Sequence, residues 1–313
     1  MKELIGKSLY RFRPCTEQSF LSLLRHEIYA STPDLFNDPY DGAFSYDTEL
    51  TVQFLKDEGI YELFLERYVP RGRTIEEVIA FVCGEAEAKW RKTCLVSCFC
   101  EDCTKEMMWA HYADSGRGFA VRYDASKIID ALGSKHHRSG LGLHKVRYRR
   151  ARSVFTIYLC RLLSMGWPWR TVETDDLFWL RTFPSLFLEK NICWREEKEW
   201  RVVLENADKR TTAKPILFLK PEGIVLGEHI TRLSRFILCS IANRESLPVS
   251  EIVQSHEKGS FGYIEKPLSP QEIAGYVNRL GATIGDLYDD ALADMNLESR
   301  EKRSIKAKTD PHK

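Results

Sequence analysis

The segment from Trp194 to Leu204, WREEKEWRVVL, constrains the fold most strongly, because a run of charged residues leads directly into a β-branched apolar run. Residues 202–204 predict a buried strand, and Glu197 and Glu199 are predicted to share one face at or near its start. Carboxylates held at the mouth of a strand are a candidate site. Alternating acids and arginines are also typical of a solvated sheet edge that resists aggregation, and taken alone the segment favours that interpretation.

The bulk properties bound the class of protein. The chain has 313 residues, 43% of them apolar and 29% charged, which is ordinary for a globular protein of one large or two small domains. Its formal net charge of +1 provides no global field that would recruit nucleic acid or a membrane. No apolar run has the length of a signal peptide or of a membrane span of roughly 18 residues. The nine scattered cysteines suggest reduced thiols, so we expect a cytoplasmic protein.

Strand and helix patterns are mixed along the chain without regular alternation. Strands are predicted at residues 9–12, 28–31, 95–99, 118–123, 146–148, 202–204, 216–219, 223–226, 236–240 and 262–265. Helices are predicted at residues 16–25, 105–113, 125–132, 153–165 and 174–190, with two over residues 48–92 and one or two over residues 271–296. This mixture favours an α+β fold with a mixed, mostly antiparallel central sheet and flanking helices.

The same patterns divide the chain. We expect a main domain over residues 1–268, which includes a helical insertion at about residues 48–92. C-terminal helices are expected over residues 269–297, and the polar residues 298–313 are predicted to form a disordered tail.

Two polar or aromatic segments are candidates for lining a site. In NDPYD, the residues Asn37, Asp38 and Asp41 are typical of a structural turn, and a ligand-lining loop is the alternative. In EMMWAHY, the residues Trp109 and Tyr112 are predicted to share one helix face. Core packing is the usual role of such a face, but amphipathic aromatics also form the walls of ligand clefts.

Two further groups leave alternatives open. The crowded cysteines indicate buried structural thiols rather than a zinc site, because few of their spacings suit metal ligation: Cys94, Cys98, Cys100 and Cys103. We therefore expect no metal. An arginine-rich stretch without acids predicts a solvated face or, alternatively, a phosphate or nucleic-acid site: Arg147, Arg149, Arg150 and Arg152. No phosphate-binding glycine loop accompanies it.

The chain resembles the bacterial family known as domain of unknown function 2971. The resemblance rests on the blocks LYRFR, YASTPDLFNDPYDG, VSCFCEDCTKEMMWAHYADSGRGFAVRYD, KNICWREEKEWRVV and GIVLGEHI, which cover most of residues 9–240. The family resemblance implies no activity, because its motifs are known as patterns and not as assigned catalytic groups.

A looser resemblance concerns function. The opening strand, helix and strand, followed much later by a strand entered through Glu-x-Glu, looks like the layout of ADP-ribosyltransferases. The resemblance implies that Arg11 or Arg13 holds the phosphate or ribose of NAD. It implies that Ser31 and Thr32 position neighbouring groups.

The same resemblance assigns roles to the carboxylates. Glu199 would contact the nicotinamide ribose and stabilise the positive charge that grows as the glycosidic bond breaks, and Glu197 would prepare the acceptor. Trp109 or Tyr112 would stack on nicotinamide. The candidate catalytic residues are Glu199, Glu197, Tyr112 and His111. The candidate binding residues are Tyr10, Arg11, Arg13, Ser31, Thr32, Asn37, Asp38, Asp41, Trp109 and Arg201.

Three functions follow as hypotheses. The first is an NAD-consuming transferase or glycohydrolase, as a bacterial toxin or phage-defence effector. The second is a module that binds or cleaves nucleic acid through the arginine-rich stretch, and the third is a non-catalytic module that binds a protein partner. The enzyme hypothesis requires Arg11, Ser31, Tyr112 and Glu199 to surround one cleft.

Overall fold

A computed structural model shows how these patterns are realised. It describes residues 4, 6–43, 45–137, 142–151, 156, 159–160, 186–256 and 262–278. Within this part of the chain, every helix is too short or too polar to cross a lipid bilayer.

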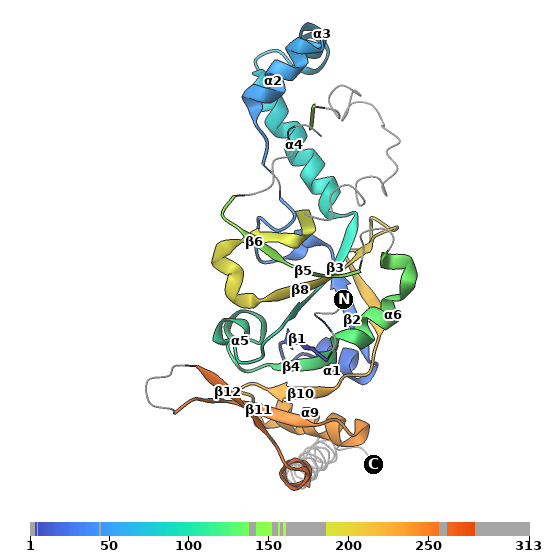
Figure 1. The fold of residues 1–313 in the computed structure, drawn as a ribbon, viewed down its shortest axis with the longest axis vertical. Coiled ribbons are helices and arrows are strands. Elements are labelled where there is room, and N and C mark those ends of the chain that lie inside the picture. The colour runs from blue at the N-terminus through green and yellow to red at the C-terminus, as the bar shows by residue number, and fades with distance from the viewer. Residues whose placement is uncertain are drawn as a thin grey trace, which may run out of the picture.

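The fold is α+β, with a large, mostly antiparallel mixed sheet and flanking helices, as predicted (Figure 1). Its strands are β1 (Ser8–Arg13), β2 (Glu27–Ser31), β3 (Cys94–Cys100), β4 (Phe119–Asp124), β5 (Gly142–Lys145), β6 (Arg147–Arg149), β7 (Glu189–Asn191), β8 (Glu199–Glu205), β9 (Ala213–Phe218), β10 (Gly223–Leu226), β11 (Val249–Gln254) and β12 (Tyr263–Pro267). Its helices are α1 (Glu17–Leu24), α2 (Thr48–Asp57), α3 (Tyr61–Tyr68), α4 (Ile75–Arg91), α5 (Glu106–Tyr112), α6 (Ala125–His137) and α9 (Arg232–Glu245). The 3-10 turns include η2 (Pro33–Leu35), η3 (Leu186–Leu188) and η4 (Ile192–Glu197).

The sheet runs in the order β12-β11-β10-β4-β1-β3-β2-β9, and β8 and β5 branch from β3. β10 and β11 pair in parallel, whereas the other pairs of this sheet are antiparallel. β6 and β7 form a separate parallel pair. The segment that contains Glu199 is therefore no solvated edge, because β8 pairs with β3 on one side and with β5 on the other.

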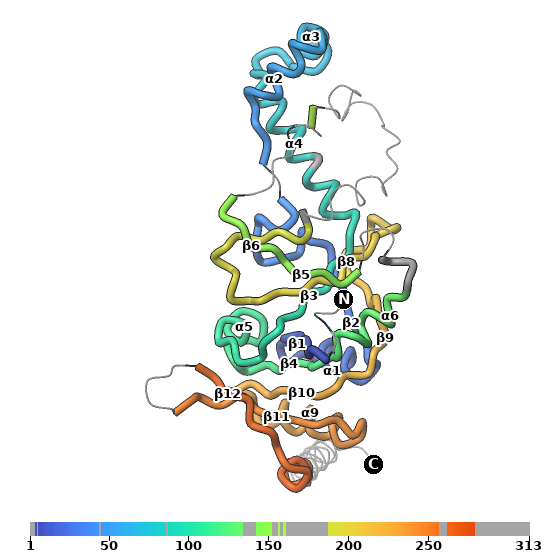
Figure 2. The backbone as a smooth tube through the Cα atoms, in the orientation of Figure 1, coloured from blue at the N-terminus to red at the C-terminus, as the bar shows by residue number. Residues whose placement is uncertain are grey.

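The helical insertion contains three helices instead of the predicted two. Gly59 adopts the left-handed conformation at φ +67° directly after α2, which ends that helix and separates it from α3. A capping box of Thr74 and Glu77 then begins α4. The three helices extend away from the sheet at one end of the molecule (Figures 1 and 2).

The predicted strand at residues 236–240 is wrong, because these residues lie inside α9. Thr231 caps that helix by accepting a hydrogen bond from the Ser234 N–H, and Leu238, Ile241 and Ala242 are buried at helical spacing. A short apolar run does not distinguish a strand from a buried helix segment. The predicted helix at 174–190 is also wrong in its described part, where η3 and β7 lie.

Several predictions fall wholly or partly outside the described residues. The predicted helix at 153–165 does so except for residues 156, 159 and 160, which are helical. In the C-terminal region, residues 270–278 are helical, and the remainder, including the predicted tail at 298–313, lies outside the described part.

The apolar core consists of packed clusters on either side of the sheet. One lies among β1, β4, α6 and α9, a second joins β3 to α4, and a third packs Phe12 of β1 against Trp109 of α5. The Phe12 and Trp109 rings meet edge to face, with centroids 5.0 Å apart. This contact fixes α5 against the strand that carries Arg11 and Arg13.

Gly118→Ala should lower the free energy of unfolding by at least about 1–3 kcal/mol, the usual cost of overpacking. A Cβ at this position would lie 2.2 Å from the Arg13 carbonyl oxygen, so β1 and β4 would be forced apart. Gly84→Ala is the matched control, because nothing lies within 4 Å of its added Cβ and it occupies a helix interior. It should raise stability by up to about 1 kcal/mol. Urea denaturation measures both changes, and equal effects would contradict the packing argument.

Candidate functional site

A cleft of about 590 Å³ lies where β1, β3, α5, β8 and the loop after β2 meet. It collects most of the residues that were predicted to form a site. The predicted residues that line it are Tyr10, Arg11, Arg13, Ser31, Asn37, Asp41, His111, Tyr112, Glu197, Glu199 and Arg201. The convergence of Arg11, Ser31, Tyr112 and Glu199 meets the spatial condition that the enzyme hypothesis sets.

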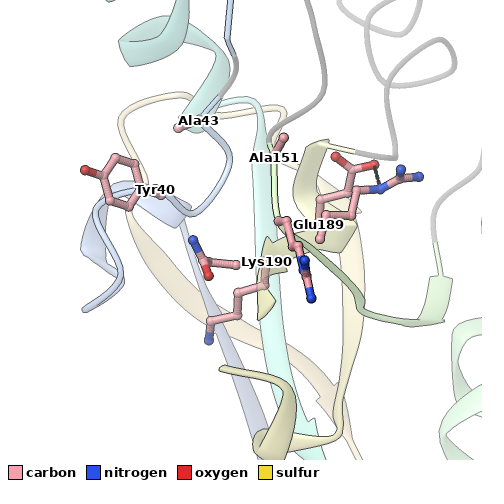
Figure 3. Close-up of a pocket in the computed structure, with 8 residues that line it drawn as sticks. Tyr40, Ala43, Ala151, Glu189 and Lys190 are labelled. Atoms are coloured by element: carbon pink, nitrogen blue, oxygen red, sulfur yellow. Dashed lines mark ion pairs between the residues drawn. The ribbon is translucent and has the colours of Figure 1, made fainter. Parts of the chain in front are cut away.

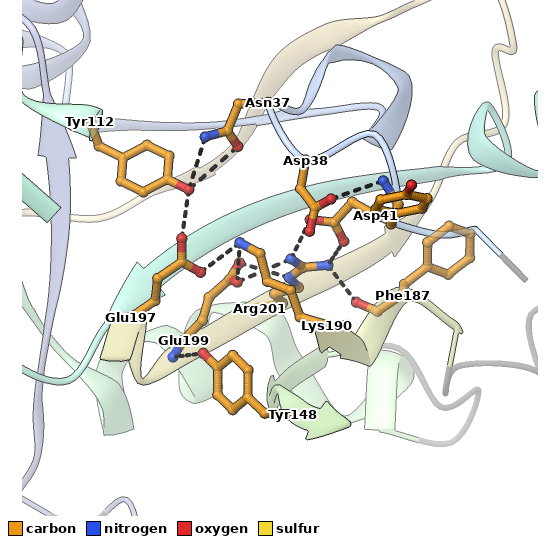
Figure 4. Close-up of polar contacts among 11 residues, drawn as sticks. Asn37, Asp38, Asp41, Tyr112, Tyr148, Phe187, Lys190, Glu197, Glu199 and Arg201 are labelled. Carbon is orange, nitrogen blue, oxygen red and sulfur yellow. Dashed lines mark hydrogen bonds and ion pairs between the residues drawn. The ribbon is translucent and has the colours of Figure 1, made fainter. Parts of the chain in front are cut away.

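A chain of hydrogen bonds runs along one wall of this cleft (Figure 4). Arg201 donates to both oxygens of Asp41, at 2.5 and 2.8 Å, and to both oxygens of Glu199, at 2.7 and 3.0 Å. The Lys190 ammonium group contacts Glu199 at 3.3 Å and Glu197 at 2.5 Å. The Tyr112 hydroxyl then donates to Glu197 at 2.7 Å.

The two ends of this chain of bonds lie in the same loop. Asn37 contacts the Tyr112 hydroxyl at 3.4 Å, and Asp41 receives the Arg201 guanidinium group. Inside the loop, Asp38 accepts a hydrogen bond from the Tyr40 N–H at 2.9 Å, which forms a tight turn. The loop is thus held from β8 and from α5 at once.

A local backbone feature brings the two glutamates together. Glu197 ends the 3-10 turn η4, Lys198 adopts the left-handed conformation at φ 45°, and Glu199 begins β8. The prediction that the two glutamates share one face of an extended strand is therefore wrong, because only Glu199 lies in the strand. The reversal at Lys198 instead brings the carboxylate of Glu197 alongside that of Glu199, where both contact Lys190.

The two carboxylates ionise differently. Burial and then repulsion from Glu199 raise the pKa of Glu197 to about 7, and Lys190 offsets only part of this increase. Burial would also raise the pKa of Glu199, but the charges of Arg201 and Lys190 outweigh it and hold that pKa below its usual value. Near neutral pH Glu199 is therefore ionised, while Glu197 is present in both its protonated and its ionised form.

The cleft is also lined by two cationic residues of β1. Arg11 and Arg13 alternate along β1 and both line the cleft. Among the described residues, neither guanidinium group has an acidic partner within ion-pair distance, and Arg11 Nη1 is buried without a hydrogen-bond partner. Burial and then the charge of Arg13 lower the pKa of Arg11 to about 9. A cationic group held in this way suits an anionic ligand.

Residues 108–202 match the model of DUF2971, a protein family of unknown function. The chain resembles DUF2971, as its sequence blocks predicted. The DUF2971 match includes Tyr112, Lys190 and the two glutamates, and it does not reach Arg11 or Arg13. No curated protein and no solved structure matches the chain. The looser resemblance to ADP-ribosyltransferases therefore stays a prediction.

Lys190 and Tyr148 were missed by sequence reasoning. Lys190 lies within the DUF2971 match, in the block KNICWREEKEWRVV, and the Tyr148 hydroxyl accepts a hydrogen bond from the Glu199 N–H at 2.8 Å. The available signal was chemical, because buried carboxylates need a cation nearby.

Three predicted site residues do not line the cleft. Trp109 is 1% exposed, and its indole N–H donates to the Cys103 carbonyl at 2.7 Å, so it is not placed to stack on a ligand. The Thr32 hydroxyl donates to the Thr212 carbonyl at 3.3 Å. Asp38 serves the turn described above, which agrees with the structural alternative considered for NDPYD. These contacts assign all three to packing or turn formation.

The crowded cysteines are buried or partly buried thiols, and polar groups contact them. The described residues contain no cluster of three or more His, Cys, Asp or Glu side chains that could hold a metal ion. The Cys100 thiol donates to the Asp102 carbonyl, and the Cys103 thiol contacts Glu265. Burial raises the pKa of all four crowded cysteines, namely Cys94, Cys98, Cys100 and Cys103.

A second cavity of about 310 Å³ lies beside the arginine-rich stretch (Figure 3). Arg149 and Arg150 line it, and Lys190 is common to both cavities. Arg147 and Arg149 both pair with Glu189, at 3.6 and 2.9 Å, which neutralises part of the stretch. Arg152 lies outside the described residues, and nucleic-acid binding stays a prediction.

Arg201→Met should lower the free energy of unfolding by about 3–5 kcal/mol, because Asp41 and Glu199 would remain buried without their main cation. Arg195→Met is the matched control. Arg195 is 67% exposed and pairs with the exposed Glu196, so its loss should cost less than about 1 kcal/mol. Urea denaturation of both variants measures the difference. Similar small losses would contradict the structural role of Arg201.

Proposed function

We propose that the cleft binds NAD and breaks the bond between nicotinamide and ribose, transferring ADP-ribose to an acceptor or to water. The observation that carries this proposal is the asymmetry of the cleft. Arg11 and Arg13 line one part of its wall with no acid of the described residues within ion-pair distance, and Glu197 and Glu199 are held together on another part. NAD has the matching asymmetry, because its pyrophosphate is anionic and its nicotinamide ribose becomes cationic during bond cleavage.

The roles of the two glutamates follow from their ionisation. When the C1′–N bond breaks, its electron pair leaves with nicotinamide, and positive charge develops on the ribose. Glu199, whose pKa is lowered by Arg201 and Lys190, stays ionised and stabilises that charge. Glu197 accepts the proton of the attacking hydroxyl or water, since the carboxyl pKa is raised to about 7 by burial and by Glu199.

The remaining lining residues fit the other parts of the nucleotide. Arginine guanidinium groups present paired donors that match phosphate oxygens, so we assign the pyrophosphate to Arg11 and Arg13. Leu35, Phe36 and Met108 provide apolar surface for a base or for nicotinamide. We assign the contact with the reacting ribose to Tyr112 rather than to Trp109, because the Tyr112 hydroxyl donates a hydrogen bond to Glu197.

The proposed reaction implies a biological setting. An enzyme that consumes NAD depletes a cofactor on which the whole cell depends, and transfer of ADP-ribose modifies its acceptor covalently. Both outcomes fit a bacterial toxin or a phage-defence effector, so we propose such a role.

Glu199→Gln should reduce NAD turnover about 100- to 1000-fold, because it removes the charge that faces the developing cation. Glu197→Gln should also reduce turnover, since Gln cannot accept the acceptor's proton. Glu196→Gln is the matched control, because Glu196 is 54% exposed and pairs with Lys105 at the surface. Release of nicotinamide from labelled NAD measures all three. A wild-type protein that releases no nicotinamide would overturn the proposed reaction.

Arg11→Met should weaken the binding of ADP-ribose about 10- to 100-fold, the value of a charge-assisted hydrogen bond to phosphate. The same substitution should leave the stability of the free protein unchanged or higher, because Arg11 Nη1 is buried without a hydrogen-bond partner and no acid of the described residues lies within ion-pair distance. Arg210→Met is the control, since its side chain is 95% exposed. Titration calorimetry and urea denaturation give the two quantities, and equal affinities of the two variants would exclude Arg11 from the binding site.

A further inference from the structure

Lys190 lies at the centre of the carboxylate wall, the hydrogen-bonded wall of the cleft that contains Asp41, Arg201, Glu199 and Glu197. Its side chain is 3% exposed, and its ammonium group is 2.5 Å from Glu197 Oε2 and 3.3 Å from Glu199 Oε2. The ring of Trp194 covers the ammonium group, with 4.9 Å between the nitrogen and the ring centroid. Lys190 is therefore held in one place by two carboxylates and an aromatic face (Figure 4 shows the carboxylates).

The two glutamates depend on Lys190 unequally. Glu199 receives two further charged hydrogen bonds from Arg201, so its ionisation does not rest on Lys190 alone. Within the described ranges, Lys190 is the only cation within ion-pair distance of Glu197. The other partner of Glu197 is the neutral hydroxyl of Tyr112.

We infer that Lys190 is a positioning residue of the cleft, whose charge holds Glu197 beside Glu199 and favours the ionised form of Glu197. As far as it concerns turnover, this inference rests on the proposed function. Without the ammonium group, Glu197 would face the charge of Glu199 in a buried position and would stay protonated. A protonated Glu197 cannot accept the proton of an acceptor.

The groups around Glu197 define what else affects its proton. Each adjoining element contributes one or more titratable groups, and these are Lys190 of β7, Glu199 of β8, Tyr112 of α5, Tyr148 of β6 and Cys100 of β3. Burial is the first cause that raises the pKa of Tyr112, of Tyr148 and of Cys100, so these groups stay neutral near pH 7. The balance of charge at Glu197 is therefore set by Glu199 and Lys190.

A stability cycle tests this without any substrate. The difference in unfolding free energy between wild type and Glu197→Gln isolates the titration of Glu197. Because the folded pKa is raised, the contribution of Glu197 is complete below its unfolded pKa of about 4.3 and is lost as the pH rises through about 7. The same difference in unfolding free energy is then measured between Lys190→Met and Lys190→Met/Glu197→Gln. In this background it should level off at a pH about one to three units higher than in the wild-type background, because Glu197 loses its proton later without the ammonium group. Lys190→Gln serves in the same cycle if Lys190→Met does not fold.

The pH profile of NAD turnover is the second test. Wild-type kcat/KM should rise with pH through about 7, as Glu197 loses its proton. The rise should move to higher pH in Lys190→Met and return towards the wild-type position in Lys190→Arg, which restores the charge. A merely structural lysine would change the height of the profile and leave its midpoint in place.

The two tests separate the inference from the proposed function. If the stability cycle shifts but wild type releases no nicotinamide, the proposed function is wrong and the positioning role of Lys190 stands. If NAD is consumed but neither the stability cycle nor the pH profile shifts in Lys190→Met, the proposed function stands and the positioning role of Lys190 is wrong. An unshifted cycle overturns the inference in either case.

Discussion

The guanidinium group of Arg201 bridges Asp41 and Glu199 inside the protein, and the rest of the cleft depends on this contact. It joins a loop that follows β2 to a strand that lies 160 residues later in the chain. Arg201 is only 1% exposed; without it Asp41 would be left as a buried charge without this cation, and Glu199 would keep only Lys190 as a cationic partner. The neighbouring Phe187 carbonyl accepts a further hydrogen bond at 2.9 Å, which satisfies another donor of the guanidinium group. A buried ion pair of this quality fixes a geometry rather than adding large net stability.

The remaining charges are arranged around that fixed point. Three acids and two cations lie in one continuous network, and the residues are Asp41, Glu199, Glu197, Arg201 and Lys190. If every acid were ionised, the network would carry one net negative charge in a buried place. Protonation of Glu197 removes this excess, which is why the pKa of Glu197, rather than that of Glu199, is raised. The network thus separates a fixed charge from an exchangeable proton.

Much of this could be predicted from residue patterns that act locally. The helix predicted at residues 16–25 is α1, which Thr16 caps by accepting a hydrogen bond from the Ser19 N–H, and β3 and β4 follow their apolar runs. Glu197 and Glu199 were singled out as carboxylates at the mouth of a predicted buried strand and through the Glu-x-Glu resemblance, although the segment taken alone favoured a solvated edge. The strand predicted at 236–240 was wrong because a short apolar run does not by itself distinguish the two-residue repeat of a strand from the 3.6-residue repeat of a helix. Lys190 and the packing of Trp109 depend on which segments meet in space, and a single sequence carries little information on that.

The two parts of the cleft differ in how their charges are compensated, and this difference bears on binding. The carboxylate wall is neutralised internally, so it is ready without a ligand. Arg11 has no such partner among the described residues, and the free energy that its burial costs is recovered only when an anion enters. A site that leaves a cation uncompensated gives up stability in the free protein in exchange for ligand affinity. Under the proposed function, NAD would bring its anionic pyrophosphate to β1 and present to Glu199 the ribose on which positive charge develops, so one ligand would match both parts of the cleft.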